Sequence, residues 1–302
     1  MHSSGREVLV GQDAVDSLLG VLDLEEIDKG LYRGPRAEGA HQRVFGGQVA
    51  GQALVAAGRT VPGDRRVHSL HGYFVRPGDS TKPIVYQVEN IRDGRSFSVR
   101  RTVALQNGQT IFFMSASFHT GERGLEHSDP APNGLARPED IPPLSEQLKS
   151  HPDRLGIWSR VPRPIDVRYA GGGSGFSASG QRPAQEHQRV WMKADGRLPD
   201  DPLIHVCVLT YASDLTLLDS VLSRHGEVWG PGGYLGTSLD HALWFHRPFR
   251  FDDWILYDSM SPTAADGRGL AQGRFFDADG VHLASATQEG LLRQTPEPPG
   301  VP

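Results

Sequence analysis

A serine, an aspartate and a histidine lie within four positions of the stretch "GTSLDHALWF", as Ser238, Asp240 and His241. These are the residue types of a serine-hydrolase triad, in which the histidine takes a proton from the serine. Residues 236–246 have the pattern of a β-strand, and side chains alternate between the two faces of a strand. Ser238 and Asp240 are therefore expected on one face and His241 on the other, which argues against a triad. The chain also lacks the G-x-S-x-G nucleophile elbow.

A carboxylate interrupts the most apolar helical stretch of the chain. Residues 202–222, "PLIHVCVLTYASDLTLLDSVL", are apolar nearly all round and predict a buried helix that contains Asp214. Burying a carboxylate without partners is costly, so Asp214 is either catalytic or a structural residue on an exposed stripe or at a cap. Gln288 raises the same question in "LASATQEGLLR", because its amide group can both donate and accept hydrogen bonds.

The two halves of the chain repeat one pattern. "SLHGYFVRP" (69–77) corresponds to "SLDHALWFHRP" (238–248), and "DGRS" (93–96) corresponds to "DGRG" (266–269). "QNGQTIFFMSAS" likewise corresponds to "DADGVHLASAT", at an offset between 170 and 172 residues. Three matches in the same order predict a duplicated domain.

Each copy is predicted to contain one helix followed by four strands. The first copy has a helix at 45–58 and strands at 67–76, 82–92, 96–106 and 110–119; the second has a helix at 202–222 and strands at 236–246, 253–262, 268–276 and 281–292. "NG" and "DG" predict hairpins between the last two strands of each copy. A central helix wrapped by an antiparallel sheet is a hotdog unit, so the predicted fold class is α+β, a double hotdog.

The domain boundaries follow from composition. We expect an N-terminal hotdog unit at 1–120, a connector at 121–186 and a C-terminal hotdog unit at 187–302. The connector is rich in Pro, Gly and Ser and contains one helix candidate, 145–161. The two units are expected to pair through the apolar strands 110–118 and 241–249, as two subunits would.

The repeat also reveals an asymmetry. At the mapped offset, Ser238 corresponds to Val67 and Gln288 falls near Phe118. One copy is apolar where the other is polar, so we expect the second copy to carry the chemistry.

Composition excludes several classes of protein. The net charge of -5 over 302 residues disfavours a nucleic-acid partner. The sequence predicts no membrane span and no signal sequence, and the single cysteine, Cys207, is consistent with a reducing cytoplasm. No cluster of His, Cys and carboxylates has ligand spacing, so we expect neither a metal nor a cofactor. His68, His71, His241 and His246 are interpreted as hydrogen-bonded strand residues.

The sequence resembles the type II acyl-CoA thioesterase family. The resemblance extends over nearly the whole chain, through "RVFGGQVAGQAL", "HSLHGYFVRPGD", "RVWMKADGRLPDD", "LTYASDLTLL", "SLDHALWFHRPF" and "ASATQEGLLR". It implies a double hotdog fold, hydrolysis of fatty acyl-CoA, and association of chains as dimers or tetramers. It also implies that Asp214, Ser238 and Gln288 hold the attacking water, with serine in place of the commoner threonine.

Glycines open the first predicted helix, where they are poor helix formers. Gly46, Gly47 and Gly51 are expected where a neighbouring segment packs closely, and Gly46 and Gly47 could also let a substrate carbonyl approach the helix start. Two alternatives to hydrolysis stay open. A hotdog enoyl-CoA hydratase would use an aspartate–histidine pair, for which Asp240 and His246 are the candidates, and a non-catalytic module would bind acyl-CoA without turnover.

Overall fold

A computed structural model describes residues 8–35, 43–147, 162–171 and 182–296. The helices in these ranges are α1 (Gly11–Leu22), α2 (Gly46–Gly58), α3 (Leu144–Gln147), α5 (Pro202–Ser213) and α6 (Asp219–His225), with a 3₁₀ turn at Pro138–Asp140. The strands are β1 (Glu25–Asp28), β2 (Leu31–Gly34), β3 (Arg66–Phe74), β4 (Ile84–Asp93), β5 (Phe97–Gln106), β6 (Gln109–His119), β7 (Ile165–Gly171), β8 (His187–Ala194), β9 (Tyr234–Ser238), β10 (Asp240–Phe245), β11 (Ile255–Ala265), β12 (Arg268–Phe276) and β13 (His282–Gln294).

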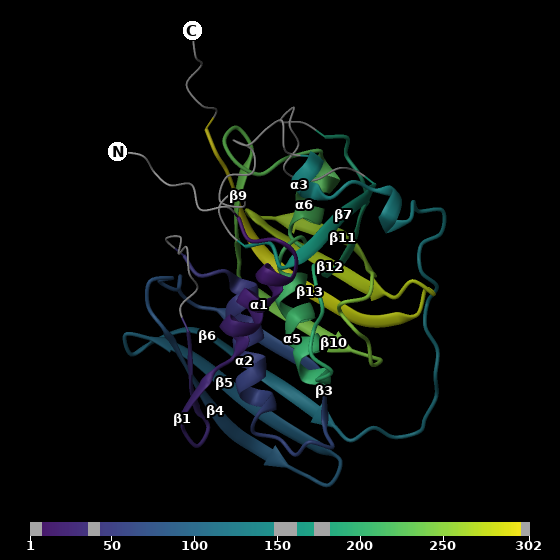
Figure 1. Cartoon of the computed structure of the whole chain (residues 1–302). Helices are drawn as coiled ribbons and strands as arrows, with labels where there is room; N and C mark the ends of the chain where they lie inside the picture. Colours follow the sequence, from purple (N-terminus) through teal and green to yellow (C-terminus); the bar gives the residue numbers. More distant parts are fainter. Residues whose placement is uncertain (1–7, 36–42, 148–161, 172–181, 297–302) are drawn as a thin grey trace.

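Within the described residues, the strands form one antiparallel sheet that curls around two central helices (Figure 1). Its order is β1-β2-β4-β5-β6-β3-β10-β13-β12-β11-β8-β7, with β9 paired to β13. The order outward from the middle is the same on both sides: β3 is followed by β6, β5 and β4, and β10 by β13, β12 and β11. This is the double hotdog that the sequence predicts.

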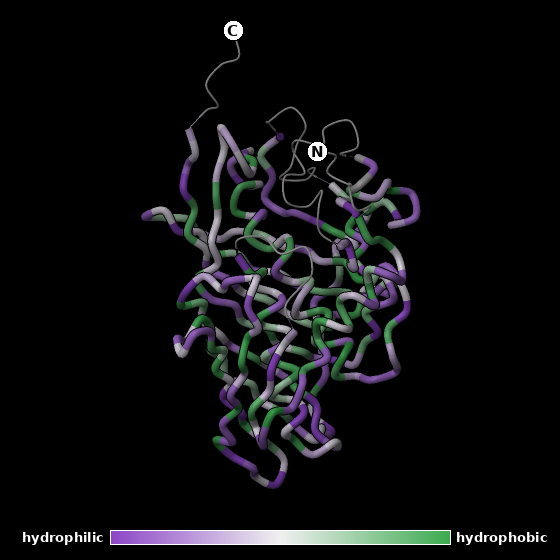
Figure 2. Tube along the Cα trace, turned by 60° about the vertical axis from the view of Figure 1, so that its left-hand side comes forward, coloured by the Kyte–Doolittle hydropathy of each residue, from purple (hydrophilic) through white to green (hydrophobic). Residues whose placement is uncertain are grey.

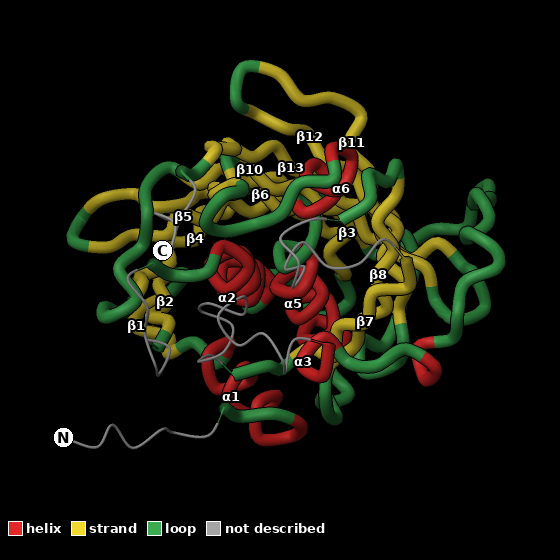
Figure 3. Tube along the Cα trace, turned by 90° about the horizontal axis from the view of Figure 1, so that it is seen from above, coloured by secondary structure: helices red, strands yellow, loops and turns green. Residues whose placement is uncertain are grey.

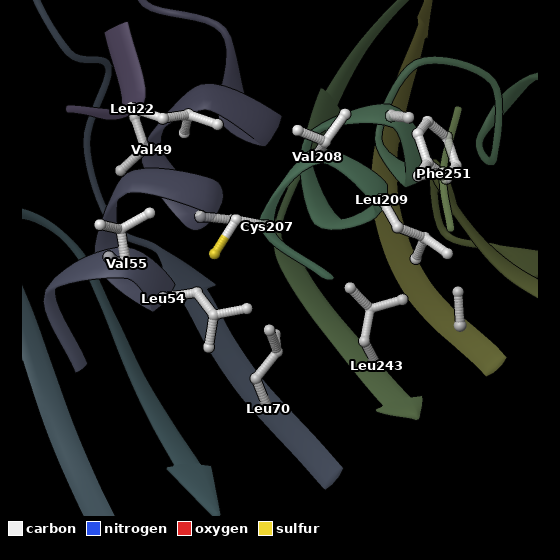
Figure 4. Close-up of a cluster of buried hydrophobic side chains, with 14 of the residues drawn as sticks. Leu22, Val49, Leu54, Val55, Leu70, Cys207, Val208, Leu209, Leu243 and Phe251 are labelled. Atoms are coloured by element: carbon white, nitrogen blue, oxygen red, sulfur yellow. The ribbon is translucent and has the colours of Figure 1, made fainter. Parts of the chain in front are cut away.

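The two units join through β3 and β10, where Leu70 lies opposite Leu243. Of the two segments expected to pair, 241–249 does lie at the junction, since it contains most of β10. The expectation is wrong for 110–118, because this segment lies in β6, which pairs with β3 and β5 inside its own unit. Figure 4 shows Leu70 and Leu243 beneath the helices, where both side chains are buried. Burial of these central leucines stabilises the junction between β3 and β10 at the middle of the sheet.

The repeated "RP" motif makes the same contacts in both units. The guanidinium of Arg76 donates to the carbonyl of Thr110 at 2.8 Å, and that of Arg247 donates to the carbonyl of His282 at 2.8 Å. Each arginine thus ties the end of a central strand to the adjacent hairpin. Equivalent contacts at equivalent positions support the duplication.

Helices α2 and α5 lie antiparallel and side by side inside the curl of the sheet (Figure 3). Their close approach requires glycine, as the sequence suggested. A Cβ atom on Gly47 would lie 2.4 Å from the carbonyl oxygen of Tyr211, and one on Gly51 would lie 3.3 Å from that of Cys207. Cys207 is buried between the helices (Figure 4), and Figure 2 shows hydrophobic segments gathered in the interior.

The single helix expected at 202–222 is instead two helices. Asp214 is the C-cap of α5, and the chain then turns before α6 begins at Asp219. The amides of Leu215, Asp219 and Ser220 bond to carbonyls three residues back, so the chain tightens instead of continuing as an α-helix. The apolar pattern predicted the burial of this segment but gave no sign of the break.

Other elements were not expected from the sequence. Helix α1 packs on α2, β1 and β2 extend one edge of the sheet, and β8 and β7 extend the other. Strand β7 lies within the proposed connector and pairs with β8. Of the helix candidate 145–161, only the part up to Gln147 is described, at the end of α3; residues 148–161 lie outside the described residues.

Candidate active site

The carboxylate of Asp214 lies where α5 ends and α2 begins. A Cβ atom on Gly46 would lie 2.7 Å from its Oδ2 atom, so only glycine leaves room for this carboxylate. The backbone amide of Gly47 donates a hydrogen bond to Asp214. The first amides of a helix have no partner within the helix and carry partial positive charge, so this position favours an anion.

Two further donors reach the same carboxylate from the sheet. Gln288 in β13 donates from Nε2 to Asp214 Oδ1 at 2.6 Å, and Ser238 at the end of β9 donates from Oγ to Oδ1 at 3.3 Å. Gln288 is completely buried, and its Oε1 atom has no hydrogen-bond partner among the described residues. The three residues proposed from sequence therefore lie together.

The electrostatics of Asp214 suit proton transfer near neutral pH. Burial raises the pKa of the carboxyl group to about 6, although hydrogen bonds from Gln288, Gly47 and Ser238 act to lower it. Although many protein atoms surround the carboxylate, Asp214 is only half-buried, so a water molecule can reach it. A base with a pKa close to the working pH is ionised and still able to hold a proton.

The Ser–His–Asp triad considered for Ser238 is not assembled, but the expected reason is wrong. Ser238 and His241 both reach the end of α5, because the strand is interrupted at Leu239 between β9 and β10. His241 Nε2 is hydrogen-bonded at 2.7 Å to Ser213 Oγ, and burial lowers the pKa of His241 to about 4. His241 is thus a neutral residue engaged with Ser213 and is not the base for Ser238.

The aspartate–histidine pair of a hydratase is not assembled either. Asp240 accepts a hydrogen bond from the amide of Glu289 at 2.6 Å, while His246 is bonded to Ser285 Oγ at 2.9 Å. The two side chains lie at opposite ends of β10, roughly 20 Å apart for an extended chain of this length. His68 is bonded to Ser117, and His71 packs against Trp244, so these histidines also have structural contacts.

Sequence reasoning did not place Tyr211, Tyr257 or Ser213 near the carboxylate, and it gave His241 no contact with α5. The pKa values of Tyr211 and Tyr257 are raised by burial and then by the charge of Asp214, so both are neutral phenols close to it. Ser213 and His241 fix the last turn of α5 through hydrogen bonds. Three of these residues lie inside the motifs "YASD" and "SLDH", so the motifs themselves contained the signal.

Comparisons with known proteins show the family of this chain. A family model described as acyl-CoA thioesterase N-terminal domain matches residues 35–119, and one described as acyl-CoA thioesterase matches residues 176–291. Acyl-CoA thioesterase 2 of Haemophilus influenzae is 39% identical over 285 residues, which cover 93% of this chain and 98% of that protein. The chain belongs to the acyl-CoA thioesterase family.

Further relatives of this thioesterase come from bacteria and mammals. Human acyl-coenzyme A thioesterase 8 is 38% identical over 289 residues, covering 92% of this chain and 89% of that protein. The crystal structure of an acyl-CoA thioesterase II from Mycobacterium marinum has a TM-score of 0.73 at 41% identity, covering 92% of this chain and 98% of that one. A hot dog protein from Alicyclobacillus acidocaldarius has a TM-score of 0.72 at 20% identity, covering 92% and 98%, and supports the fold alone.

The described residues contain neither a membrane-spanning helix nor a cluster of metal ligands. None of the described helices has the length and apolar character needed to cross a membrane. The described residues also contain no group of three or more His, Cys, Asp or Glu side chains placed to hold a metal ion.

Proposed function

We propose that this protein hydrolyses acyl-CoA thioesters to a free carboxylic acid and CoA, with a water molecule as the nucleophile and Asp214 as the general base. The observation that carries the proposal is a carboxylate with a pKa of about 6, held by two side-chain donors at the start of a helix. Family membership supports the same reaction.

The hydrogen bonds leave a place for the attacking water. A carboxylate offers about four lone-pair sites, and Ser238, Gln288 and the amide of Gly47 occupy three of them. Water bound at the remaining site gives its second hydrogen to Gln288 Oε1 or Ser238 Oγ, both of which can accept. Fixing a water molecule at both hydrogens aims its oxygen lone pair at the thioester carbon.

The reaction balances with the groups at hand. The water oxygen bonds to the carbonyl carbon while Asp214 takes a proton, and the carbon–sulfur bond then breaks. Because a thiol has a pKa near 8.5, the thiolate of CoA leaves without a strong acid and receives the proton from Asp214. The developing oxyanion needs fixed donors, and we assign this role to the backbone amide of Gly46 at the start of α2, because the amide of Gly47 already donates to Asp214.

The experiment is a thiol-release assay on a series of acyl-CoAs from acetyl-CoA to palmitoyl-CoA. The proposal requires stoichiometric release of free thiol and carboxylic acid. Hydration of an enoyl-CoA without thiol release would identify a hydratase. Saturable binding of acyl-CoA with no turnover of any substrate in the series would instead identify a binding module. Either result would refute the proposed function.

The same proposal includes a cytoplasmic location and the association of whole chains. Cys207 is buried and burial raises the pKa of its thiol, which suits a protein that stays reduced. Among the strands that the structure describes, β1 and β7 lie at the two edges of the sheet, and further copies could cover them. Light scattering tests this point, because a mass of one chain, 33.0 kDa, at full activity would exclude an obligate oligomer.

A further inference from the structure

A cavity of about 360 Å³ lies beside the candidate active site, between α5 and β7. Its walls come from β7, from the start of α3, from the residues that precede β7, and from the turn that follows α5. Most of this lining is aliphatic or proline, including Leu144, Pro164, Ile165 and Val167. The volume falls within the roughly 300–1,000 Å³ of ordinary small-molecule pockets.

Four charged residues also line the cavity, Arg163, Asp166, Arg168 and Asp195, and each of them has interactions within the protein. Arg168 is paired with Asp166 at 2.7 Å, and its guanidinium also donates to the carbonyls of Pro138 and Ile141. Asp195 accepts a hydrogen bond at 2.7 Å from the amide of Gly11 at the start of α1. With these charges compensated inside the protein, the cavity presents mainly hydrocarbon surface to a ligand.

The cavity borders the catalytic residues through α5. Tyr211 and Leu215 line it, and they lie on either side of Asp214 in the chain. Tyr211 also packs edge-on against Phe45, with ring centroids 5.0 Å apart, and Phe45 is the N-cap of α2, next to Gly46. One tyrosine therefore contacts both the cavity and the start of the helix that faces Asp214.

Most residues of the cavity wall belong to a part of the chain that the family models do not cover, although Asp195, Tyr211, Leu215 and Thr216 lie inside the second matched region. The matched regions are 35–119 and 176–291, whereas α3 and β7 lie between them.

We propose that this cavity binds the hydrocarbon chain of the acyl group, and that Val167 in β7 sets the acyl length that the enzyme prefers. This inference rests on the proposed thioesterase function. The thioester carbonyl then lies at Asp214, and the chain extends past Tyr211 into the cavity. An apolar chain fits because burying it releases water from an aliphatic surface.

The test compares kcat/KM across the acyl-CoA series for paired variants. Val167→Trp fills the cavity, and Val167→Ala enlarges it. Val99→Trp is the matched control, because Val99 is also a half-buried strand valine but lies on the face of β5 opposite its buried residues. One methylene in a hydrophobic pocket changes discrimination by roughly tenfold or more.

In Val167→Trp, we expect kcat/KM for the longest wild-type substrates to fall at least about tenfold relative to that for acetyl-CoA. Val167→Ala should shift the optimum toward longer chains, which keeps the test valid if the tryptophan variant does not fold. Val99→Trp should keep the wild-type profile. A folded Val167→Trp and an active Val167→Ala that both keep the wild-type length profile would overturn this inference while leaving hydrolysis intact. Absence of thiol release in the wild type would instead refute the proposed function.

Discussion

The two ends of the α2–α5 pair occupy equivalent positions in the two units, but one end contains a carboxylate and the other is apolar. At one end, the carboxylate of Asp214 faces Gly46 and Gly47; at the other, Gly58 faces the side chain of Leu203. Counted from the N-caps Phe45 and Asp201, Gly47 corresponds to Leu203, and Gly58 corresponds to Asp214. At one end of the helix pair, a carboxylate therefore packs against a glycine. At the equivalent position of the other end, a glycine packs against a leucine.

The strands differ between the two ends in the same way. Val67 lies opposite Phe118 as Ser238 lies opposite Gly290, so these pairs are equivalent. Gln288 precedes Gly290 by two residues and therefore corresponds to Ala116, a refinement of the position near Phe118 expected from sequence. All three polar groups around the Asp214 site have apolar counterparts. Duplication supplied two similar frameworks, and the side chains decide which of them can hold water.

The largest expected effect comes from removing the base. Asp214→Asn preserves the shape of the site but cannot accept a proton, so kcat should fall on the order of a hundredfold or more. The control Asp64→Asn alters an exposed aspartate beyond the other end of α2 and should leave kcat unchanged. Both are measured by thiol release on folded protein, and an Asp214→Asn enzyme with near wild-type turnover contradicts the assignment.

The pH profile should report the same carboxylate. Burial raises the pKa of Asp214 from 3.8 to about 6, and only the ionised form acts as a base. Activity should therefore be full above this pKa and fall about tenfold for each pH unit below it. The control is the residual activity of Asp214→Asn, which should lack this limb. A wild-type profile that stays flat from pH 7 down to pH 5 would show that Asp214 does not titrate during catalysis.

The next test gives the residue that β13 contributes to the Asp214 site the identity of its counterpart in the first unit. Gln288→Ala introduces the residue found at Ala116 and removes both a donor to Asp214 and an acceptor for water. We expect kcat/KM to fall roughly ten- to a hundredfold, since a misplaced nucleophile costs about that much. Thermal unfolding separates this from loss of structure. If an intact variant turns over acyl-CoA normally, Gln288 has no part in holding the water.

The smallest effects are expected at Ser238. Ser238→Val, which copies Val67, removes one hydrogen bond to a charged group and should lower kcat/KM by about tenfold. Ser238→Thr keeps the hydroxyl and should stay within about threefold of wild type on the same grounds. Mass spectrometry during turnover provides the decisive control. An acyl adduct on Ser238 would mean that the serine, not water, attacks the thioester.

The fold could be predicted largely from local pattern. Turn residues, alternating strands and the repeated motifs placed α2, β3 to β6 and β11 to β13 to within a few residues. Short or weakly patterned elements such as β1, β2 and β7 were missed, because their pairing partners lie elsewhere in the sheet. The break after α5 was missed because an apolar run looks the same in one helix or two.

The sequence by itself determined which groups the site contains: the carboxylate of Asp214 in an apolar segment, polar residues in only one of two copies, and glycines at a helix start. The tertiary structure decided how these groups meet. Asp214 is 24 residues from Ser238 and 74 from Gln288, and no local periodicity specifies contacts over such separations. The sequence alone predicted that Ser238 and His241 would face apart, yet the interrupted strand brings both to α5. The raised pKa of Asp214 is likewise a tertiary property, because it arises from burial between two helices and a sheet that belong to distant parts of the chain.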